Sequence, residues 1–338
     1  LSNITGDGTI GISIAAGTAS DTAGNTALGA GPSGTFTADN TAPTITGISA
    51  PSLTIAKNGT DVTYTVTYSG ADLVTLAAGN VSLNTTGGAT ATVAVTGAGT
   101  VTRTVTLSNI TGDGTIGISI AAGTASDTAG NTALGAGPSG TFTADNTAPT
   151  ITGISAPSLT IAKNGTDVTY TVTYSGADTV TLAAGNVSLN TTGGATATVA
   201  VTGAGTVTRT VTLSNITGDG TIGISIAAGT ASDTAGNTAL GAGPSGTFTA
   251  DNTAPTVTIT APAAGTWDGT QSLTFTPDDG TTDARISTGV WEAKASGVII
   301  NTLNGWGPPA SGVNYTVEVR STDPAGNIGS ASRTYTMP

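Results

Sequence analysis

The sequence predicts an all-β protein made of antiparallel β-sandwiches in tandem. The segment LSNITGDGTIGISIAAGTASDTAGN begins at Leu1, Leu107 and Leu213, so the chain repeats with a period of 106 residues. This period is close to the length of one sandwich domain and far too long for one coil of a solenoid. The composition is rich in Thr and Val, which favour strands, and in Gly and Asn, which favour tight turns. We therefore expect separate sandwich domains that follow one another as an elongated rod.

The domain boundaries are expected at the linkers of sequence Asp-Asn-Thr-Ala-Pro. The copies differ at one position, Leu73 against Thr179, before the chain diverges at Val257. Half a repeat cannot hold a sandwich core alone, so its missing strands are expected either in a longer chain or in another chain. The expected domains are the C-terminal half of a repeat (1–39), two whole repeats (40–145 and 146–251) and a divergent last domain (252–338).

Within 40–145 the apolar residues alternate with polar ones. Val62, Tyr64, Val66 and Tyr68 are separated by single threonines, which predicts a half-buried strand. Arg103 falls on the apolar phase of a later strand, so we expect a bulge or a strand end there. Seven or more short strands with frequent turns indicate an immunoglobulin-like (Ig-like) sandwich. The expected strands are 45–49, 53–56, 61–68, 74–76, 81–83, 91–95, 101–107, 116–120 and 140–143.

The last domain keeps the opening TAPT and the closing STDPAGN but differs otherwise. It holds all three tryptophans, Trp267, Trp291 and Trp306, and the only two glutamates, Glu292 and Glu318. We interpret it as a related sandwich with longer loops. Its tryptophans are expected in core packing, with a sugar-stacking surface as the alternative.

Composition excludes several classes of function. The chain has no Cys and no His, so thiol nucleophiles, disulfides and the commonest general base are absent. No nucleophile–base pair or phosphate-binding loop is recognisable, and we expect no enzymatic activity. A net charge of −12 argues against nucleic-acid binding, and no apolar run reaches the length of a membrane span. A long Cys-free chain is typical of bacterial surface proteins, so an extracellular location is expected.

Acidic residues converge where one domain joins the next. The strand polarity of a Greek-key sandwich brings two outgoing loops, one of them the DxAGN loop, beside the preceding linker. Carboxylates that converge without nearby bases repel one another unless a cation neutralises them, and an all-oxygen ligand set suits Ca2+. The predicted ligands are Asp39, Asp72 and Asp127 at the first joint, Asp145, Asp178 and Asp233 at the second, and Asp251, Asp278 or Asp279, and Asp323 at the third.

The alternative role for each of these aspartates is to form a turn. Asp and Asn side chains accept hydrogen bonds from nearby backbone groups in loops. Asp113 and Asp219, in the segment TGDGT, are expected to act in this way only. Lys57, in the turn Lys-Asn-Gly-Thr, is expected to be solvated and not to form an isopeptide crosslink.

The motif DxAGN, followed by a strand and D-x-TAPT, resembles the tandem bacterial Ig-like repeats of large secreted adhesins and biofilm-associated surface proteins. The resemblance covers essentially the whole chain. It implies Ca2+ at the domain junctions, with the linker Asp and the DxAGN Asp as ligands. The linker departs from the frequent DTTAP, because Asn40, Asn146 and Asn252 place an amide where the family has a hydroxyl.

Three functions follow as hypotheses. The first is an extracellular stalk, stiffened by Ca2+, that supports cell adhesion or a biofilm matrix. The second is a self-assembling filament or sheath subunit, in which 1–39 pairs its strands with another copy of the chain. The third is a glycan-binding tip formed by the tryptophans of the last domain.

Overall fold

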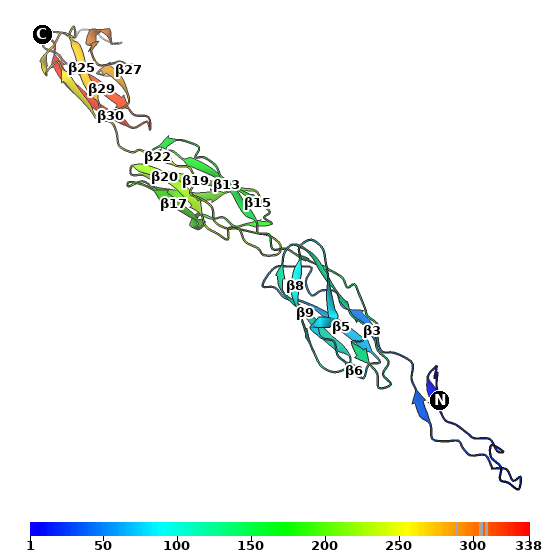
Figure 1. Ribbon diagram of the computed structural model, residues 1–338. Helices are drawn as coiled ribbons and strands as arrows, with labels where there is room; N and C mark the ends of the chain where they lie inside the picture. Colours follow the sequence, from blue (N-terminus) through cyan, green and yellow to red (C-terminus); the bar gives the residue numbers. More distant parts are fainter. Residues whose placement is uncertain (288, 304–306, 308–309) are drawn as a thin grey trace. The chain divides into compact units, whose positions relative to one another are not determined.

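A computed structural model describes residues 1–287, 289–303, 307 and 310–338 (Figure 1). The described residues form strands and three 3-10 turns, without an α-helix, which confirms the prediction of an all-β chain of tandem Ig-like sandwiches. None of the described helices has the length and apolar character needed to cross a bilayer. The chain divides into two compact units, Leu1–Thr147 with Thr234–Asn237, and Ala148–Asp233 with Thr238–Pro338.

The first unit contains one complete sandwich of two four-stranded sheets. One sheet has the order β3-β5-β9-β8 and the other β4-β12-β10-β7, with β6 and β11 as a separate two-stranded ribbon. The strands are β3 (Thr44–Ile48), β4 (Ile55–Ala56), β5 (Val62–Ser69), β6 (Leu73–Val74), β7 (Val81–Thr85), β8 (Thr90–Thr96), β9 (Thr102–Thr111), β10 (Gly114–Ile120), β11 (Ala125–Ser126) and β12 (Phe142–Ala144), with a 3-10 turn at Ala78–Asn80.

The start of the sandwich is divided between its two sheets. β3 pairs antiparallel with β5, whereas β4 pairs parallel with β12. Pro51 lies between β3 and β4 and has no N–H to donate to a ladder, which favours an interruption of pairing there. This parallel pair departs from the antiparallel sandwich that we predicted from the sequence.

The core follows the alternation read from the sequence. Val62, Tyr64 and Val66 of β5 are fully buried, and they pack with the inward-facing isoleucines of β10. The Tyr64 hydroxyl donates to the carbonyl oxygens of Ile116 at 3.2 Å and Gly140 at 3.1 Å. These bonds give the buried phenol polar partners from the opposite sheet, so Tyr64 ties the two sheets together.

Arg103 lies at a strand end, one of its two predicted settings. It is the second residue of β9 and pairs directly with Val66, whereas the register shift between β8 and β9 lies at Thr90/Thr92. Its buried guanidinium donates from Nη2 to the carbonyl oxygen of Val74 at 2.8 Å. Val101, expected to face inward, is 58% exposed because it precedes the strand.

The second unit begins with a sandwich of the same topology. Its sheets have the orders β13-β15-β19-β18 and β14-β22-β20-β17, and β16 pairs with β21. The strands are β13 (Thr150–Ile154), β14 (Ile161–Ala162), β15 (Val168–Ser175), β16 (Thr179–Val180), β17 (Val187–Thr191), β18 (Thr196–Thr202), β19 (Thr208–Thr217), β20 (Gly220–Ile226), β21 (Ala231–Ser232) and β22 (Phe248–Ala250), with a 3-10 turn at Ala184–Asn186.

The last domain, in the same unit, has sheets of three and five strands. Their orders are β23-β25-β28 and β24-β30-β29-β26-β27. Its core centres on Trp267, whose ring centroid lies 4.6 Å from that of Tyr335 and 6.2 Å from that of Tyr315. The strands are β23 (Val257–Ala261), β24 (Gly265–Thr266), β25 (Ser272–Pro277), β26 (Thr281–Ile286), β27 (Glu292–Ala293), β28 (Val298–Ile299), β29 (Asn314–Thr322) and β30 (Ile328–Thr336), with a 3-10 turn at Ile300–Thr302.

Residues 1–39 form a single strand pair, β1 (Gly8–Ile10) with β2 (Phe36–Ala38). Their sequence is identical to that of 107–145, so the complete sandwich provides a direct comparison. Ile118 is 0% exposed in the sandwich, whereas its counterpart Ile12 is 49% exposed. The difference shows that this apolar face is buried only when the strands of the first half of a repeat cover it.

This comparison yields a matched pair of stability variants. Ile118→Ala removes a fully buried side chain and should lower the free energy of unfolding of its sandwich by about 2–5 kcal/mol. Ile12→Ala changes the same local sequence at a half-exposed position and should alter stability by less than about 0.5 kcal/mol. Scanning calorimetry of the full chain checks both, with the unaltered 146–251 repeat as internal reference. Equal effects of the two variants would contradict the burial pattern.

Candidate functional site

The DxAGN loops lie beside the preceding linkers, as strand polarity predicts. In the first unit the Asn131 side-chain amide donates to the carbonyl oxygen of Asp39 at 3.0 Å. In the second unit the Asn327 amide donates to the carbonyl oxygen of Asp251 at 2.9 Å. The asparagine of each loop therefore joins its own sandwich to the linker that leads into it.

The loop aspartates hold these asparagines in place. Asp127 accepts hydrogen bonds from the backbone N–H of Asn131 at 2.9 Å and from its side-chain amide at 2.8 Å. The amide of Asn131 is the main cause of the lowered pKa of the Asp127 carboxyl. Asp323 is buried, which by itself raises the pKa of its carboxyl, but bonds from Asn327 and neighbouring N–H groups lower that pKa below its ordinary value. The turn role proposed for single aspartates is thus present at both positions.

At the first and third joints the second aspartate is bound by a threonine. Asp72 accepts bonds from the N–H of Thr128 at 2.8 Å and from its hydroxyl at 2.6 Å. Asp278 accepts the equivalent pair from Thr256 at 2.6 and 2.7 Å, and the Thr256 hydroxyl is the main cause of its lowered pKa. Asp72 therefore binds the DxAGN loop, whereas Asp278 binds the end of the linker itself.

At the third joint the predicted acidic residues surround one open hollow. Asp251, Asp278, Asp279 and Asp323 line a space of about 280 Å3 together with Thr253, Ala254 and Pro255. Their oxygen ligands are of the type that Ca2+ takes. Among the described residues, no three acidic side chains are already arranged as metal ligands. The carboxylates that line the hollow are instead engaged by hydrogen-bond donors, and binding a cation there would require some of them to turn.

The remaining predicted ligands lie at the ends of strands. The Asp39 carboxylate accepts from the N–H of Thr41 at 3.0 Å, and that of Asp145 accepts from Thr147 at 3.1 Å. In the second unit the N–H of Asp178 donates to the carbonyl oxygen of Ser232 at 2.9 Å, which places Asp178 next to the residue before Asp233. Asp145 belongs to the first unit and Asp178 and Asp233 to the second.

The aspartate of TGDGT has a role that the sequence interpretation missed. Asp219 accepts bonds from the N–H of Asn252 at 2.6 Å and from the Thr253 hydroxyl, so it anchors the linker that leaves its own sandwich. Asp113 binds the following linker in the same way through Asn146 and Thr147. The expectation that these aspartates only form a turn is wrong. The available signal was their constant separation of 33 residues from the linker asparagine.

The linker asparagine connects two turns of the preceding sandwich. The Asn252 side-chain amide donates to the carbonyl oxygen of Gly218 at 2.8 Å, and its side-chain oxygen accepts from the N–H of Asn164 at 2.7 Å. Asn146 makes the equivalent bonds to Gly112 and Asn58. A threonine hydroxyl at this position is shorter and offers no such pair of separate donor and acceptor atoms. These two bonds explain why the linker sequence DNTAPT has an asparagine where threonine is frequent.

Two further contacts fix the third joint. The Lys163 ammonium donates to the carbonyl oxygen of Gly326 in the STDPAGN loop. Its counterpart Lys57 donates in the same way to the carbonyl oxygen of Gly236 at 2.5 Å within the first unit, so the expectation that Lys57 is solvated is wrong. Gly329 of β30 lets the linker approach closely, because a Cβ there would lie 1.6 Å from the carbonyl oxygen of Pro255.

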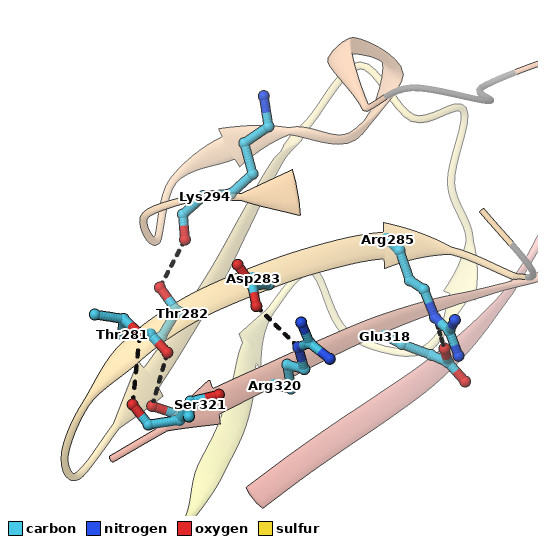
Figure 2. Close-up of polar contacts among 9 residues, drawn as sticks. Thr281, Thr282, Asp283, Arg285, Lys294, Glu318, Arg320 and Ser321 are labelled. Carbon is cyan, nitrogen blue, oxygen red and sulfur yellow. Dashed lines mark hydrogen bonds and ion pairs between the residues drawn. The ribbon is translucent and has the colours of Figure 1, made fainter. Parts of the chain in front are cut away.

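The two described tryptophans of the last domain lie in different settings. Trp267 is buried in the core, and Trp306 lies outside the described residues. Trp291 is half-buried, with the guanidinium carbons of Arg285 and Arg320 at 4.3 and 4.5 Å from its ring centroid. Figure 2 shows each arginine beside its ion-pair partner on the neighbouring strand: Arg285 of β26 with Glu318 of β29, and Arg320 of β29 with Asp283 of β26.

No family model matches the chain, and no curated protein is similar to it. The solved structures that resemble it include the Escherichia coli adhesin FdeC, at 18% identity over 88% of this chain and 96% of that one, with a TM-score of 0.33. A tandem fragment of titin matches at 10% identity over 88% and 99%, with a TM-score of 0.29. A protocadherin gammaB7 fragment matches at 14% identity over 86% and 73%, also with a TM-score of 0.29. Identities and TM-scores this low support no inference about function.

The anchoring of the linker by Asp113 predicts a pH dependence. The Thr147 hydroxyl and the Asn146 N–H lower the pKa of the Asp113 carboxyl below its ordinary 3.8. The anchoring is therefore complete above pH 3.8 and is lost as the pH falls through the lower folded-state pKa. The amide chemical shift of Asn146, followed by NMR during acid titration, should report a midpoint below 3.8. Asp113→Asn should abolish this titration, and a midpoint at or above 3.8 would contradict the interaction.

Proposed function

We propose that this chain is part of an extracellular stalk of a bacterial surface adhesin, in which Ca2+ stiffens the joints between tandem Ig-like sandwiches. The observation that carries the proposal is the double attachment of the linker in the second unit. Asn252 binds the preceding sandwich, and the carbonyl oxygen of Asp251 is bound by Asn327 of the following domain. A linker held from both sides suits a load-bearing joint better than a flexible tether.

The electrostatics of the third joint support a cation. Four aspartates line one hollow, and the nearby ammonium of Lys163 is already bound to a carbonyl oxygen. Like charges this close destabilise one another unless a counter-ion is present. Ca2+ accepts six to eight oxygen ligands in flexible geometry, so it can use these carboxylates together with loop carbonyls. Mg2+ demands a tighter octahedron, which an open hollow of this kind suits less well.

Composition and resemblance support the location. The chain has no cysteine, and its DxAGN and D-x-TAPT motifs resemble those of secreted adhesin repeats. Cell attachment and biofilm matrix are the two settings in which such a stalk would serve. Neither setting requires catalysis, which fits the absence of histidine and cysteine.

A hollow beside Trp291 favours glycan binding as a second candidate function. The space is about 220 Å3 and is lined by Trp291, Arg285, Glu318, Ser330, Ala331 and Ser332. A half-buried indole with charged and hydroxyl groups around it offers both a flat apolar surface and hydrogen-bonding partners for a sugar.

Calcium binding predicts a metal-dependent melting temperature. Ca2+ at 100 times its Kd should stabilise the folded chain by about 2.7 kcal/mol, and EDTA should reverse this effect. Asp279→Asn removes one charge from the hollow and keeps an acceptor for the Gly280 N–H, so it should reduce the shift of the last domain without unfolding it. Asp167→Asn, outside the predicted site, is the charge-matched control. Identical melting in Ca2+ and EDTA, followed by calorimetry, would contradict the calcium proposal.

The glycan candidate makes a separate prediction. Binding of the full chain to a glycan array should be lost with Trp291→Ala and retained with Lys294→Ala, a charged neighbour that does not line the hollow. Circular dichroism of both variants checks that the domain remains folded. If no glycan on the array shows binding that depends on Trp291, the glycan candidate is wrong and the stalk remains the proposed function.

A further inference from the structure

Strands β8 and β18 end their sheets, and beyond a register shift at Thr90/Thr92 in β8 and Thr196/Thr198 in β18 each keeps a regular stretch of five neutral residues. β8 has β9 as its only neighbour in the sheet, and β18 has β19. Both consist of the same seven residues, TATVAVT, with no charged residue and no proline. Between Thr92 and Thr96 the pairing of β8 with β9 is regular, so this stretch presents a straight row of backbone groups on its outer side.

Other sheet ends in the described part of the chain are less open to pairing. β3 is bulged between Ile45 and Gly47, and β4 has only two residues. In the last domain the edge strand β27 is also two residues long, and Glu292 pairs with Lys294 there. β7 is neutral like β8, but it is shorter and starts directly after the 3-10 turn at Ala78–Asn80. Natural proteins usually protect edges by such short, bulged or charged strands.

We propose that the β8 and β18 edges pair with the same edges of a second copy of the chain, in antiparallel orientation. A second copy presents an identical neutral strand, and the acidic residues that give the chain its net charge of −12 are absent from it. When the two strands align so that Ala94 faces Ala94, the exposed side chain of Thr92 faces the exposed Thr96 of the other copy. The same alignment places half-buried Val93 opposite half-buried Val95, so the sheet continues across the contact.

This contact differs from strand exchange because every sandwich stays intact. One edge of five regular residues forms only a few backbone hydrogen bonds, and each replaces bonds to water, so its net contribution is small. Pairing through a single edge is therefore weak and reversible. Each chain carries two such edges, so neighbouring copies can be joined repeatedly, which suits lateral association of surface stalks. The proposal does not depend on Ca2+ or on residues 1–39.

The absence of cysteine allows a direct test in the full chain. In an antiparallel pair of identical strands only the residue on the two-fold axis faces itself, so with Ala94 on the axis Ala94→Cys alone should form a disulfide-linked dimer under mild oxidation, because directly opposed Cβ atoms lie about 4.5–5.5 Å apart. A mixture of Thr92→Cys and Thr96→Cys chains should form the mixed dimer. Thr65→Cys lies on the exposed side of the central strand β5 and should stay monomeric. Ser82→Cys, on β7, tests the competing edge. Crosslinking at Ser82, or equal crosslinking at Thr65 and Ala94, would overturn the assignment.

A second measurement avoids oxidation. The native chain should sediment faster as its concentration rises, and Ala94→Lys with Ala200→Lys should abolish this concentration dependence, because facing lysines repel across the edge. Thr65→Lys with Thr171→Lys adds the same charge to the central strands and should leave the dependence intact. A native chain that remains monomeric at every soluble concentration would contradict the proposal.

Discussion

The hydrogen bonding of the linker is the interaction on which the rest of the structure depends. A chain that passes from one sandwich to the next leaves both ladders, so its backbone groups need partners elsewhere. In the second unit Asp219 and Gly218 bind Asn252 from the preceding sandwich, and Asn327 binds the carbonyl oxygen of Asp251 from the following domain. The linker thus becomes an ordered element although it belongs to no strand. Its sequence is constrained accordingly, since Asp, Asn and Thr each have a defined partner.

The same bonds determine what the acidic residues can do. A carboxylate that accepts two or three N–H or O–H bonds is stabilised as the anion, and the lowered pKa values of Asp127, Asp278 and Asp323 reflect this. These aspartates are therefore charged at neutral pH whether or not a metal is present. Turn formation and cation binding are not exclusive, because a carboxylate has more lone pairs than its loop uses. A cation bound in the hollow of the third joint would use these remaining lone pairs after some of the carboxylates had turned toward it.

Local sequence patterns predicted the strands and the positions of the loops. They did not predict which side chains bind residues far away in the sequence. The alternation of Val62, Tyr64 and Val66 specifies a half-buried strand directly, and strand polarity places Asn131 beside Asp39. Asp219 was assigned to a turn because TGDGT is a complete turn signature by itself, and nothing local indicates a second partner. Lys163 was missed for the same reason, since its partner Gly326 lies in another domain. The parallel pairing of β4 with β12 likewise depends on which sheet the chain enters after Pro51.

The two copies of one sequence show why local patterns have this limit. Residues 1–39 and 107–145 are identical, and both pair their strands in the same register, yet only the second copy buries its isoleucines. Residues 1–39 therefore carry the alternating pattern of an inward-facing strand although they have no hydrophobic core to pack against. Burial, and with it most of the stability, comes from β5, β7 and the first five residues of β9, which are supplied by a different part of the repeat. The anchoring of the linker needs less: Asp7 accepts from the N–H of Asn40 as Asp113 does from that of Asn146, although residues 1–39 have no completed sandwich. Pairing of the two strands that flank this segment, β1 with β2 or β10 with β12, is sufficient.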